Sequence, residues 1–322
     1  MNPVSVIIYS YILTALLLVY FIVRDLRQKD LFFNLHKKIA YLCVIVLCFG
    51  IICAFYAHLI EPFILITKQV EIENTSFKNP IKIAFVADIQ AGRHKKIDWI
   101  EKITDKIIAT EPDLVIFGGD LIDNEGVFED ESIYLEPLKK VAKKYPSFYV
   151  FGNHEYGLGQ MDLSKRHLGT GDKTKELTNQ MEKLNITLLK NNLYCLEVKN
   201  QNLCLFGIDD IYAGKKDYAE LKNLPENYPL IFITHNPDGI LDYPEIFKKP
   251  NLVLAGHTHG GQVYLPVLGP VGSVDLILPK KFYRGLNYWE NIPIFTSVGV
   301  GESGGQIRFM SIPEIVLITL TP

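Results

Sequence analysis

Five short apolar runs constrain the fold of this 322-residue chain most, because each ends at the same kind of side chain. Each run consists of aliphatic or aromatic residues, followed by a small residue and then by Asp, Asn or His. The runs are IKIAFVAD (81–88), DLVIFGGD (113–120), SFYVFGNHE (147–155), YPLIFITHN (228–236) and NLVLAGHTHG (251–260). Apolar runs of this length, bounded by turn residues, are typical of buried strands.

Amphipathic segments separate the first three runs, at Ile97–Thr110 and at roughly Glu131–Lys144. Such alternation of strand and helix predicts an α/β domain whose first strands are largely parallel. In domains of this kind, ligands bind where the strands end and the loops begin. From Gln262 to Leu320 the chain is richer in Gly, Pro and strand-like segments, so we expect this part to add antiparallel strands.

Two long apolar stretches lie near the N-terminus. Val4–Val23 carries no charge, and the second stretch, Ile39 to about Ile66, begins with ~20 residues that could span a bilayer alone. The first stretch lacks the basic segment and the cleavage site of a signal peptide, so two retained helices are the favoured interpretation. We predict a membrane anchor over 1–67, with transmembrane helices at about 4–23 and 39–60, and a second domain over 68–322.

Positive charge is concentrated between the two predicted spans. The connecting segment carries five basic residues, whereas the outer flanks carry none until Lys68; the five are Arg24, Arg27, Lys29, Lys37 and Lys38. The positive-inside rule places this segment in the cytoplasm. We therefore predict a multi-pass protein of the cell membrane whose large domain is extracytoplasmic. The formal net charge of −3 gives no reason to expect a nucleic-acid partner.

Cys195 and Cys204 flank a predicted hairpin whose turn lies near Lys199–Asn202. Opposed cysteines could form a disulfide in an oxidising compartment, but two small, buried, unpaired side chains are the favoured interpretation. The other three cysteines lie inside the second apolar stretch and form no ligand face.

The ends of the five runs supply a set of metal-binding side chains: Asp88; Asp120 and Asp123; Asn153 and His154; His235; and His257 and His259. Each is unremarkable alone, because Asp after a strand is often only a turn or cap residue. Together they are the ligands that a pair of divalent ions requires, and the absence of thiolates argues against structural zinc.

These residues carry a resemblance to a known superfamily. VADIQAG, GGDLID (118–123), GNHE (152–155), THNPD (234–238) and GHTHGGQ (256–262) closely resemble the calcineurin-like metallophosphoesterases. The GHTHGGQ block, the HNPD block and the ending GVGESGGQIRF…PEIVLITL resemble the membrane-associated branch. That branch includes phosphodiesterases of the YkuE and YaeI kind and transmembrane proteins with a metallophosphoesterase domain. The resemblance extends from about residue 80 onwards. It implies a four-layer α-β-β-α sandwich of two mixed sheets, with a dinuclear metal site at one edge.

The resemblance also implies a ligand set. The first ion would be held by Asp88, Asp120 and His259, with position 90 as the remaining ligand. The second would be held by Asp120, Asn153, His235 and His257, so that Asp120 bridges the two. The ions could be Mn²⁺, Mg²⁺, Zn²⁺ or Fe. Two such ions can convert water into hydroxide for attack on a phosphoester.

Two further residues receive roles from the resemblance. His154 would face the substrate and donate a proton or stabilise developing charge, and Asn153 lies beside it. Asp123 would orient His154, with a local turn cap as the alternative. Arg93 could contact a phosphate together with His94, Lys95 and Lys96, although a solvated basic loop is the favoured interpretation of this segment.

Position 90 departs from the family pattern, because Gln90 stands where most members have His. An amide oxygen binds hard divalent ions more readily than zinc. Gln90 could bind the ion directly, hold a water that binds it, or leave the first site weak or empty.

We therefore expect a membrane-anchored, metal-dependent phosphoesterase acting on a phosphodiester, a pyrophosphate or a phosphomonoester, with a lipid-linked or cell-envelope substrate favoured. Hydrolysis of the pyrophosphate of UDP-2,3-diacylglucosamine is an alternative, although that substrate is cytosolic. A weakened enzyme that serves as a metal-binding sensor or scaffold is another. The sequence does not indicate the oligomeric state.

Overall fold

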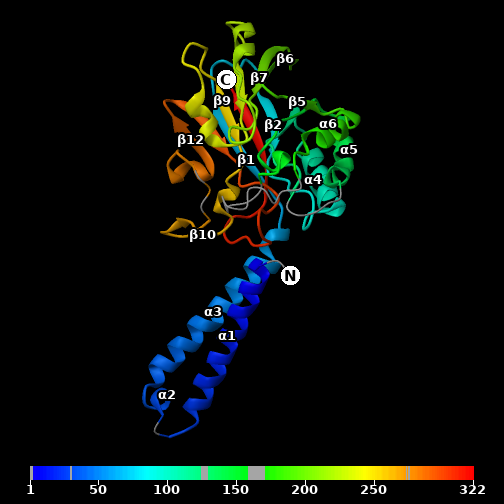
Figure 1. Cartoon of the computed structure of the whole chain (residues 1–322). Helices are drawn as coiled ribbons and strands as arrows, with labels where there is room; N and C mark the ends of the chain where they lie inside the picture. The colour runs from blue at the N-terminus through cyan, green and yellow to red at the C-terminus, as the bar shows by residue number, and fades with distance from the viewer. Residues whose placement is uncertain (1–2, 30, 125–129, 159–170, 273, 275) are drawn as a thin grey trace.

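The computed structural model describes residues 3–29, 31–124, 130–158, 171–272, 274 and 276–322. A two-helix hairpin projects from one end of an α/β domain (Figure 1). Its helices are α1 (Pro3–Leu26) and α3 (Lys37–Leu59), joined through the short α2 (Phe32–Leu35). Both long helices are apolar and long enough to cross a membrane, since ~20 residues suffice. This confirms the prediction of two N-terminal helices of that kind.

The domain contains two six-stranded mixed sheets, as the fold prediction requires. In the first, β2, β3, β4 and β5 run parallel to one another, and β14 lies antiparallel to β2 and parallel to β1. Its strand order is β1 (Ile66–Glu73), β14 (Glu314–Thr321), β2 (Ile81–Val86), β3 (Leu114–Phe117), β4 (Ser147–Tyr149) and β5 (Thr187–Leu188).

The second sheet has a parallel centre and antiparallel edges. Its order is β12 (Gly285–Trp289), β13 (Ile292–Thr296), β9 (Leu252–Ala255), β8 (Leu230–Ile233), β7 (Gln201–Gly207) and β6 (Asn192–Val198). The antiparallel strands expected after Gln262 are present as the β12–β13 pair and as β14 against β2. However, β13 and β14 also make parallel pairs, with β9 and β1.

Three apolar cores explain why the strands appear in the sequence as continuous hydrophobic runs. In β2, Ile83 and Phe85 face the second sheet, whereas Ala84 and Val86 face the helices. Because both faces are buried, no polar alternation appears in the sequence. The first sheet is covered by α4 (Ile97–Ala109), α6 (Thr174–Lys183), and η2 (Glu131–Leu138) with α5 (Lys139–Ala142).

Short 3₁₀ helices pack on the outer face of the second sheet. They are η4 (Ala219–Asn223), η5 (Pro237–Asp242) and η7 (Lys280–Tyr283). They contribute Leu221, Ile240 and Phe282 to a core that also holds Phe206 and Phe232 of the sheet. The strands β8 and β9 are therefore buried on both faces and hold the loops that follow them in place.

The end of α3 is bonded directly to the domain. His58 Nδ1 lies 2.6 Å from the carbonyl oxygen of Gln306, and Gln306 Nε2 donates to the carbonyl of His58 at 3.2 Å. Glu61, in the short helix η1 (Glu61–Phe63), accepts the main-chain N–H groups of Met310 and Ser311. The loop that precedes β14 is thus attached to the base of the helical hairpin. The predicted boundary at residue 67, between the membrane anchor and the second domain, stays a prediction.

The structure corrects the favoured interpretation of two cysteines. Cys195 and Cys204 stand opposite each other in the β6–β7 hairpin and form a disulfide. Cys195 is exposed and Cys204 is buried, so they are not two buried, unpaired side chains. The antiparallel register explains the pairing, since it places the two residues directly across from each other.

Candidate metal centre

The predicted ligands follow strands of both sheets, and the structure brings them together at one edge. Asp88 follows β2, Asp120 follows β3 and Asn153 follows β4, all in the first sheet. The three histidines come from the second sheet, where His235 follows β8 and both His257 and His259 follow β9. The ligand atoms form two groups, and the atoms within each group all lie within 4.8 Å of one another. One consists of Asp120, His235 and His257, and the other of Asp88, Asp120 and His259.

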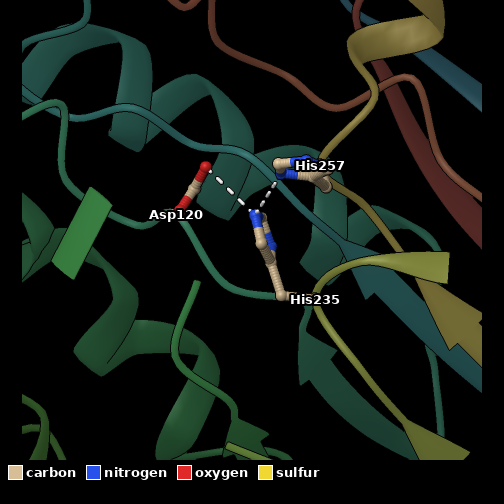
Figure 2. A group of neighbouring side chains, drawn as sticks. All are labelled: Asp120, His235 and His257. Carbon is tan, nitrogen blue, oxygen red and sulfur yellow. Dashed lines mark hydrogen bonds and ion pairs between the residues drawn. The ribbon is translucent and has the colours of Figure 1, made fainter. Parts of the chain in front are cut away.

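The first group is held by its own hydrogen bonds (Figure 2). His235 Nε2 lies 3.1 Å from Asp120 Oδ2 and 3.2 Å from His257 Nδ1. The other ring nitrogen of His235 lies 2.8 Å from the carbonyl oxygen of Gly118. With a metal ion bound, His235 would be neutral, with its Nδ1–H donating to this carbonyl and the lone pair of Nε2 directed into the group, as in many metal-binding histidines.

The second group shares Asp120 with the first. His259 Nε2 lies 3.8 Å from Asp88 Oδ1, and His259 Nδ1 lies 3.2 Å from the carbonyl oxygen of Gly301. The main-chain N–H of His257 donates to both carboxylate oxygens of Asp88, at 2.9 and 3.1 Å. One carboxylate common to two ligand groups is the arrangement in which Asp120 can bridge two ions.

Three predicted ligand atoms are buried without a hydrogen-bond partner among the described residues: Gln90 Oε1, Asn153 Oδ1 and His257 Nε2. A buried polar atom without a partner is unfavourable, so such atoms are rare in folded proteins. All three are electron-pair donors of the kind that divalent ions accept. The side chains present therefore fit a metal centre.

The backbone around the ligands is strained. Asp88, Gln90, Asp120, His257 and His259 all adopt left-handed conformations, with φ between 49° and 70°. For residues other than glycine this costs of order 1–3 kcal/mol each, and such strain is concentrated at functional sites. The strained turns direct these five side chains inwards at the strand ends.

Two glycines allow the loops to approach the ligands closely. Gly119 has a φ of +88°, and a Cβ atom there would lie 2.6 Å from His235 Nδ1. A Cβ atom on Gly152 would lie 2.2 Å from Asp120 Oδ1. Any side chain at either position would displace a predicted ligand.

Burial and mutual charge shift the pKa values of the site. Burial raises the pKa of Asp88 to about 7, against the opposing effect of His235. Burial would also raise the pKa of Asp120, but His235 and other histidines hold it below its ordinary value. Burial lowers the pKa of His257 to about 3, and burial and then Arg308 lower that of His259. His257 and His259 are thus held neutral. Burial would also lower the pKa of His235, but Asp120 and then Asp88 raise it to about 10, which shows how strongly the buried carboxylates favour a cation beside them.

His154 lies at the edge of the two groups. Its Nδ1 contacts the main-chain carbonyl of Asp123, and its Nε2 lies 3.3 Å from Ser303 Oγ and 3.8 Å from Asp120 Oδ2. Asp123 therefore does contact His154, but through its carbonyl oxygen. The predicted orienting role of Asp123 stays a prediction for its carboxylate.

The structure contradicts part of the interpretation of the basic segment 93–96. Arg93 is exposed, and its predicted contact with substrate stays a prediction. Lys95 is only 1% exposed, so it does not belong to a solvated loop. Its Nζ lies 3.2 Å from Glu302 Oε1 and donates to the carbonyl of Pro62 at 2.6 Å. Burial lowers its pKa to about 8, which Glu302 opposes.

Sequence reasoning missed Glu155, to which it gave no role. Glu155 is fully buried and accepts main-chain N–H groups of Asp120 at 3.1 Å, Leu121 at 2.7 Å and Gly152 at 2.7 Å. This one carboxylate thus joins the two loops that carry Asp120 and Asn153. The only feature of the sequence that could have pointed to Glu155 is its place directly after His154, the predicted catalytic histidine.

Arg308 is a second residue whose position the sequence left open. Its buried guanidinium donates to the carbonyls of Val298, Gly301 and Ser311, and lies 3.5 Å from His259 Nδ1. It holds the loop before β14 in a compact form beside the second ligand group. In the sequence, Arg308 stands close to the glycine-rich stretch 299–305, which leaves a structural role and a role near the site equally open.

Comparisons with known proteins agree with this architecture. The family model of the calcineurin-like phosphoesterases matches residues 81–261. Phosphodiesterase YaeI of Escherichia coli is 32% identical over 82% of this chain and 92% of its own length. Metallophosphoesterase YkuE of Bacillus subtilis is 27% identical over 82% of this chain and 88% of its own. A metallophosphoesterase of Helicobacter pylori is 30% identical over 83% of this chain and 66% of its own length. The chain therefore belongs to the calcineurin-like phosphoesterase family, a family of hydrolases that use divalent metal ions.

Proposed function

We propose that this protein is a membrane-anchored phosphodiesterase with a dinuclear metal centre. The observation that carries the proposal is the pair of ligand groups that share Asp120. Asp88, Gln90 and His259 would complete the first site, while Asn153, His235 and His257 would complete the second. When bound, two divalent ions would neutralise the phosphoryl oxygens and provide a nucleophile at neutral pH.

The protein's own residues would position the substrate and move one proton. With Nδ1–H donating to the Asp123 carbonyl, protonated His154 presents its Nε2–H at the edge of the ligand groups. From there it can donate a proton to the leaving oxygen. Asn153 lies beside it and could also contact the phosphate, and exposed Arg93 could do so from the loop after β2.

The test uses the full chain, purified in detergent and stripped of metal. Bis-p-nitrophenyl phosphate should be hydrolysed after addition of Mn²⁺ or Mg²⁺, and Asp120→Asn should abolish turnover because it removes the shared carboxylate. Glu226→Gln is the matched control and should retain full activity. Glu226 is an exposed acid that precedes β8, whereas the predicted ligand His235 follows this strand. Absence of turnover with every divalent ion would instead favour a metal-binding sensor or scaffold.

We further propose that α1 and α3 cross the membrane and that the domain, residues 68–322, is extracytoplasmic. Two observations support this orientation. The five basic residues lie in the last turn of α1, in the connection after it and in the first turn of α3. Cys195 and Cys204 form a disulfide, which persists in oxidising compartments. Reporter fusions within 24–38 and after the last residue should indicate opposite sides. A cytoplasmic domain would overturn the orientation and favour a nucleotide-linked substrate.

The substrate that we propose is a phosphoester attached to a membrane lipid or to the cell envelope near the bilayer. Ser303, which lies 3.3 Å from His154 Nε2, is only three residues from Gln306, which bonds His58 at the end of α3. The site is therefore connected through one short loop to the base of the membrane anchor. A phosphodiester in a phospholipid vesicle should be hydrolysed faster than the same headgroup ester in solution.

A further inference from the structure

A small hairpin on the domain exposes unusually apolar side chains. Strands β10 (Tyr264–Leu265) and β11 (Gly269–Pro270) pair antiparallel. Between them, Val267 is fully exposed and Leu268 is 71% exposed, and Val271 follows at 56%. Turns usually carry Gly, Asn, Asp or Pro. Val267 also has a φ of +75°, which is rare for a β-branched residue, so turn geometry does not explain the choice of side chain.

The hairpin begins beside the end of α3. The main-chain N–H of Tyr264 donates to the carbonyl of Phe309 at 2.8 Å, and the Phe309 ring packs edge-on against Tyr56, with centroids 6.4 Å apart. The N–H of Arg308 donates to the carbonyl of Ala57. Figure 1 shows β10 at the end of the domain from which α1 and α3 leave. The hairpin therefore lies at the level where α3 would emerge from the bilayer.

We propose that the β10–β11 hairpin inserts Val267 and Leu268 into the surface of the bilayer that α1 and α3 cross. This rests on the membrane anchoring proposed above. A lipid surface fits because the α3 end at Tyr56 would lie in the interfacial zone, where aromatic residues gather. An exposed apolar tip at that level has the lipid boundary as its neighbour.

Basic residues around the hairpin match the lipid headgroups. The Arg284 guanidinium lies 4.9 Å from the centroid of the Tyr264 ring and donates to the carbonyl of Met310. Lys280 and Lys281 are exposed on the same connection between β11 and β12. Cations beside an apolar tip can contact phosphate groups while the tip enters the acyl boundary.

Insertion of the hairpin would also position the metal centre. Gln262, between His259 and the hairpin, donates to the carbonyl of Ser303 at 3.0 Å and accepts the N–H of Ser303 at 2.8 Å. Ser303 contacts His154 Nε2. The hairpin, the ligand turn and the loop beside His154 are thus joined by direct bonds, and the bilayer contact holds the site at the lipid surface.

The experiment measures tryptophan fluorescence of the full chain in vesicles whose phospholipids carry bromine on the acyl chains, both near the headgroup and near the bilayer centre. Leu268→Trp adds a reporter to the two native tryptophans, whose emission is subtracted with the parent protein. Ile246→Trp is the matched control, since Ile246 is also a large apolar residue and is 87% exposed. Ile246 precedes β9, whereas His257 and His259 follow this strand, so it lies at the other end of the strand from the ligands. Phe49→Trp reports on the middle of α3.

We expect the emission added at position 268 to be largely lost in brominated vesicles, while emission at 246 is retained and emission at 49 is lost. Retained emission at 268 with loss at 49 would overturn the hairpin proposal and leave the anchor intact. Retained emission at both positions would overturn the anchor and the hairpin together. Because no outcome depends on turnover, failure here is distinguishable from failure of the proposed phosphodiesterase activity.

Discussion

The side-chain amide of Gln90 donates a hydrogen bond from Nε2 to Asp120 Oδ2 across 3.2 Å. The same amide holds its oxygen, which has no hydrogen-bond partner among the described residues, within the buried site. Gln90 thus stabilises the shared carboxylate by a hydrogen bond and offers a weak, uncharged ligand atom. This pairing supports the proposal that Gln90 belongs to the candidate metal centre.

Replacing Gln90 with histidine should tighten binding of the first ion and shift preference towards softer metals. Imidazole is a stronger ligand for Zn²⁺ and Fe²⁺ than an amide oxygen. Metal content after dialysis and the ion dependence of hydrolysis measure the effect. Gln180→His, on α6 and away from the site, is the control. Unchanged metal content and ion dependence in Gln90→His would mean that Gln90 is not a ligand.

Replacing His154 with alanine should lower kcat by about 10²–10⁴-fold, the usual contribution of a general acid or base. Metal content should not change, because His154 belongs to neither ligand group. Steady-state kinetics and metal analysis of the same preparation separate the two effects. A variant that loses metal together with activity would show that His154 supports the centre and does not act as the proton donor.

Replacing Glu155 with glutamine should destabilise the protein and weaken metal binding together. An amide NH₂ group would face main-chain N–H donors that now reach a carboxylate, and each unsatisfied donor costs about 1–3 kcal/mol. Thermal unfolding and metal titration measure both consequences. Glu182→Gln, on the exposed face of α6, should change neither. If Glu155→Gln kept its stability and lost only kcat, Glu155 would have a direct role in the chemistry.

Reduction of the Cys195–Cys204 disulfide should lower the free energy of unfolding by about 2.5 kcal/mol, as expected for a short closed loop. The Cys195→Ser/Cys204→Ser double variant should show the same loss and no further response to reductant. Thiol labelling of intact cells tests the orientation as well. Both cysteines should remain unlabelled until a reductant is added, and labelling without reductant would contradict an oxidising location.

The strand ends that carry the candidate ligands were predictable as strand ends because each is a local pattern, a buried apolar run that ends at a polar turn. Asp120 and His235 are 115 positions apart, yet the apolar run before each residue identifies it as a candidate ligand without reference to the other. The resemblance to a family then supplied the pairing that no local pattern contains. The two apolar helices were predictable for the same local reason, since length and composition alone define them.

Residues that act through distant main-chain atoms were not predictable. Glu155 reaches N–H groups 34 and 35 positions earlier in the chain, and Lys95 reaches the carbonyl of Pro62, 33 positions earlier. Main-chain partners leave no trace in the sequence, because any residue supplies them. The favoured interpretation of Cys195 and Cys204 as unpaired was wrong for a related reason, since only the register of β6 against β7 determines whether two cysteines meet.

The position of β14 imposes an order on the assembly of the molecule. This strand lies between β1 and β2 in the first sheet, although some 230 residues separate it from β2 in the chain. Until residues 314–321 have been synthesised, β1 has no neighbour and the edge of β2 is open. Unpaired strand edges promote aggregation. A chain that emerges at a membrane with α1 and α3 already inserted would therefore depend on protection by chaperones until its last strand arrives.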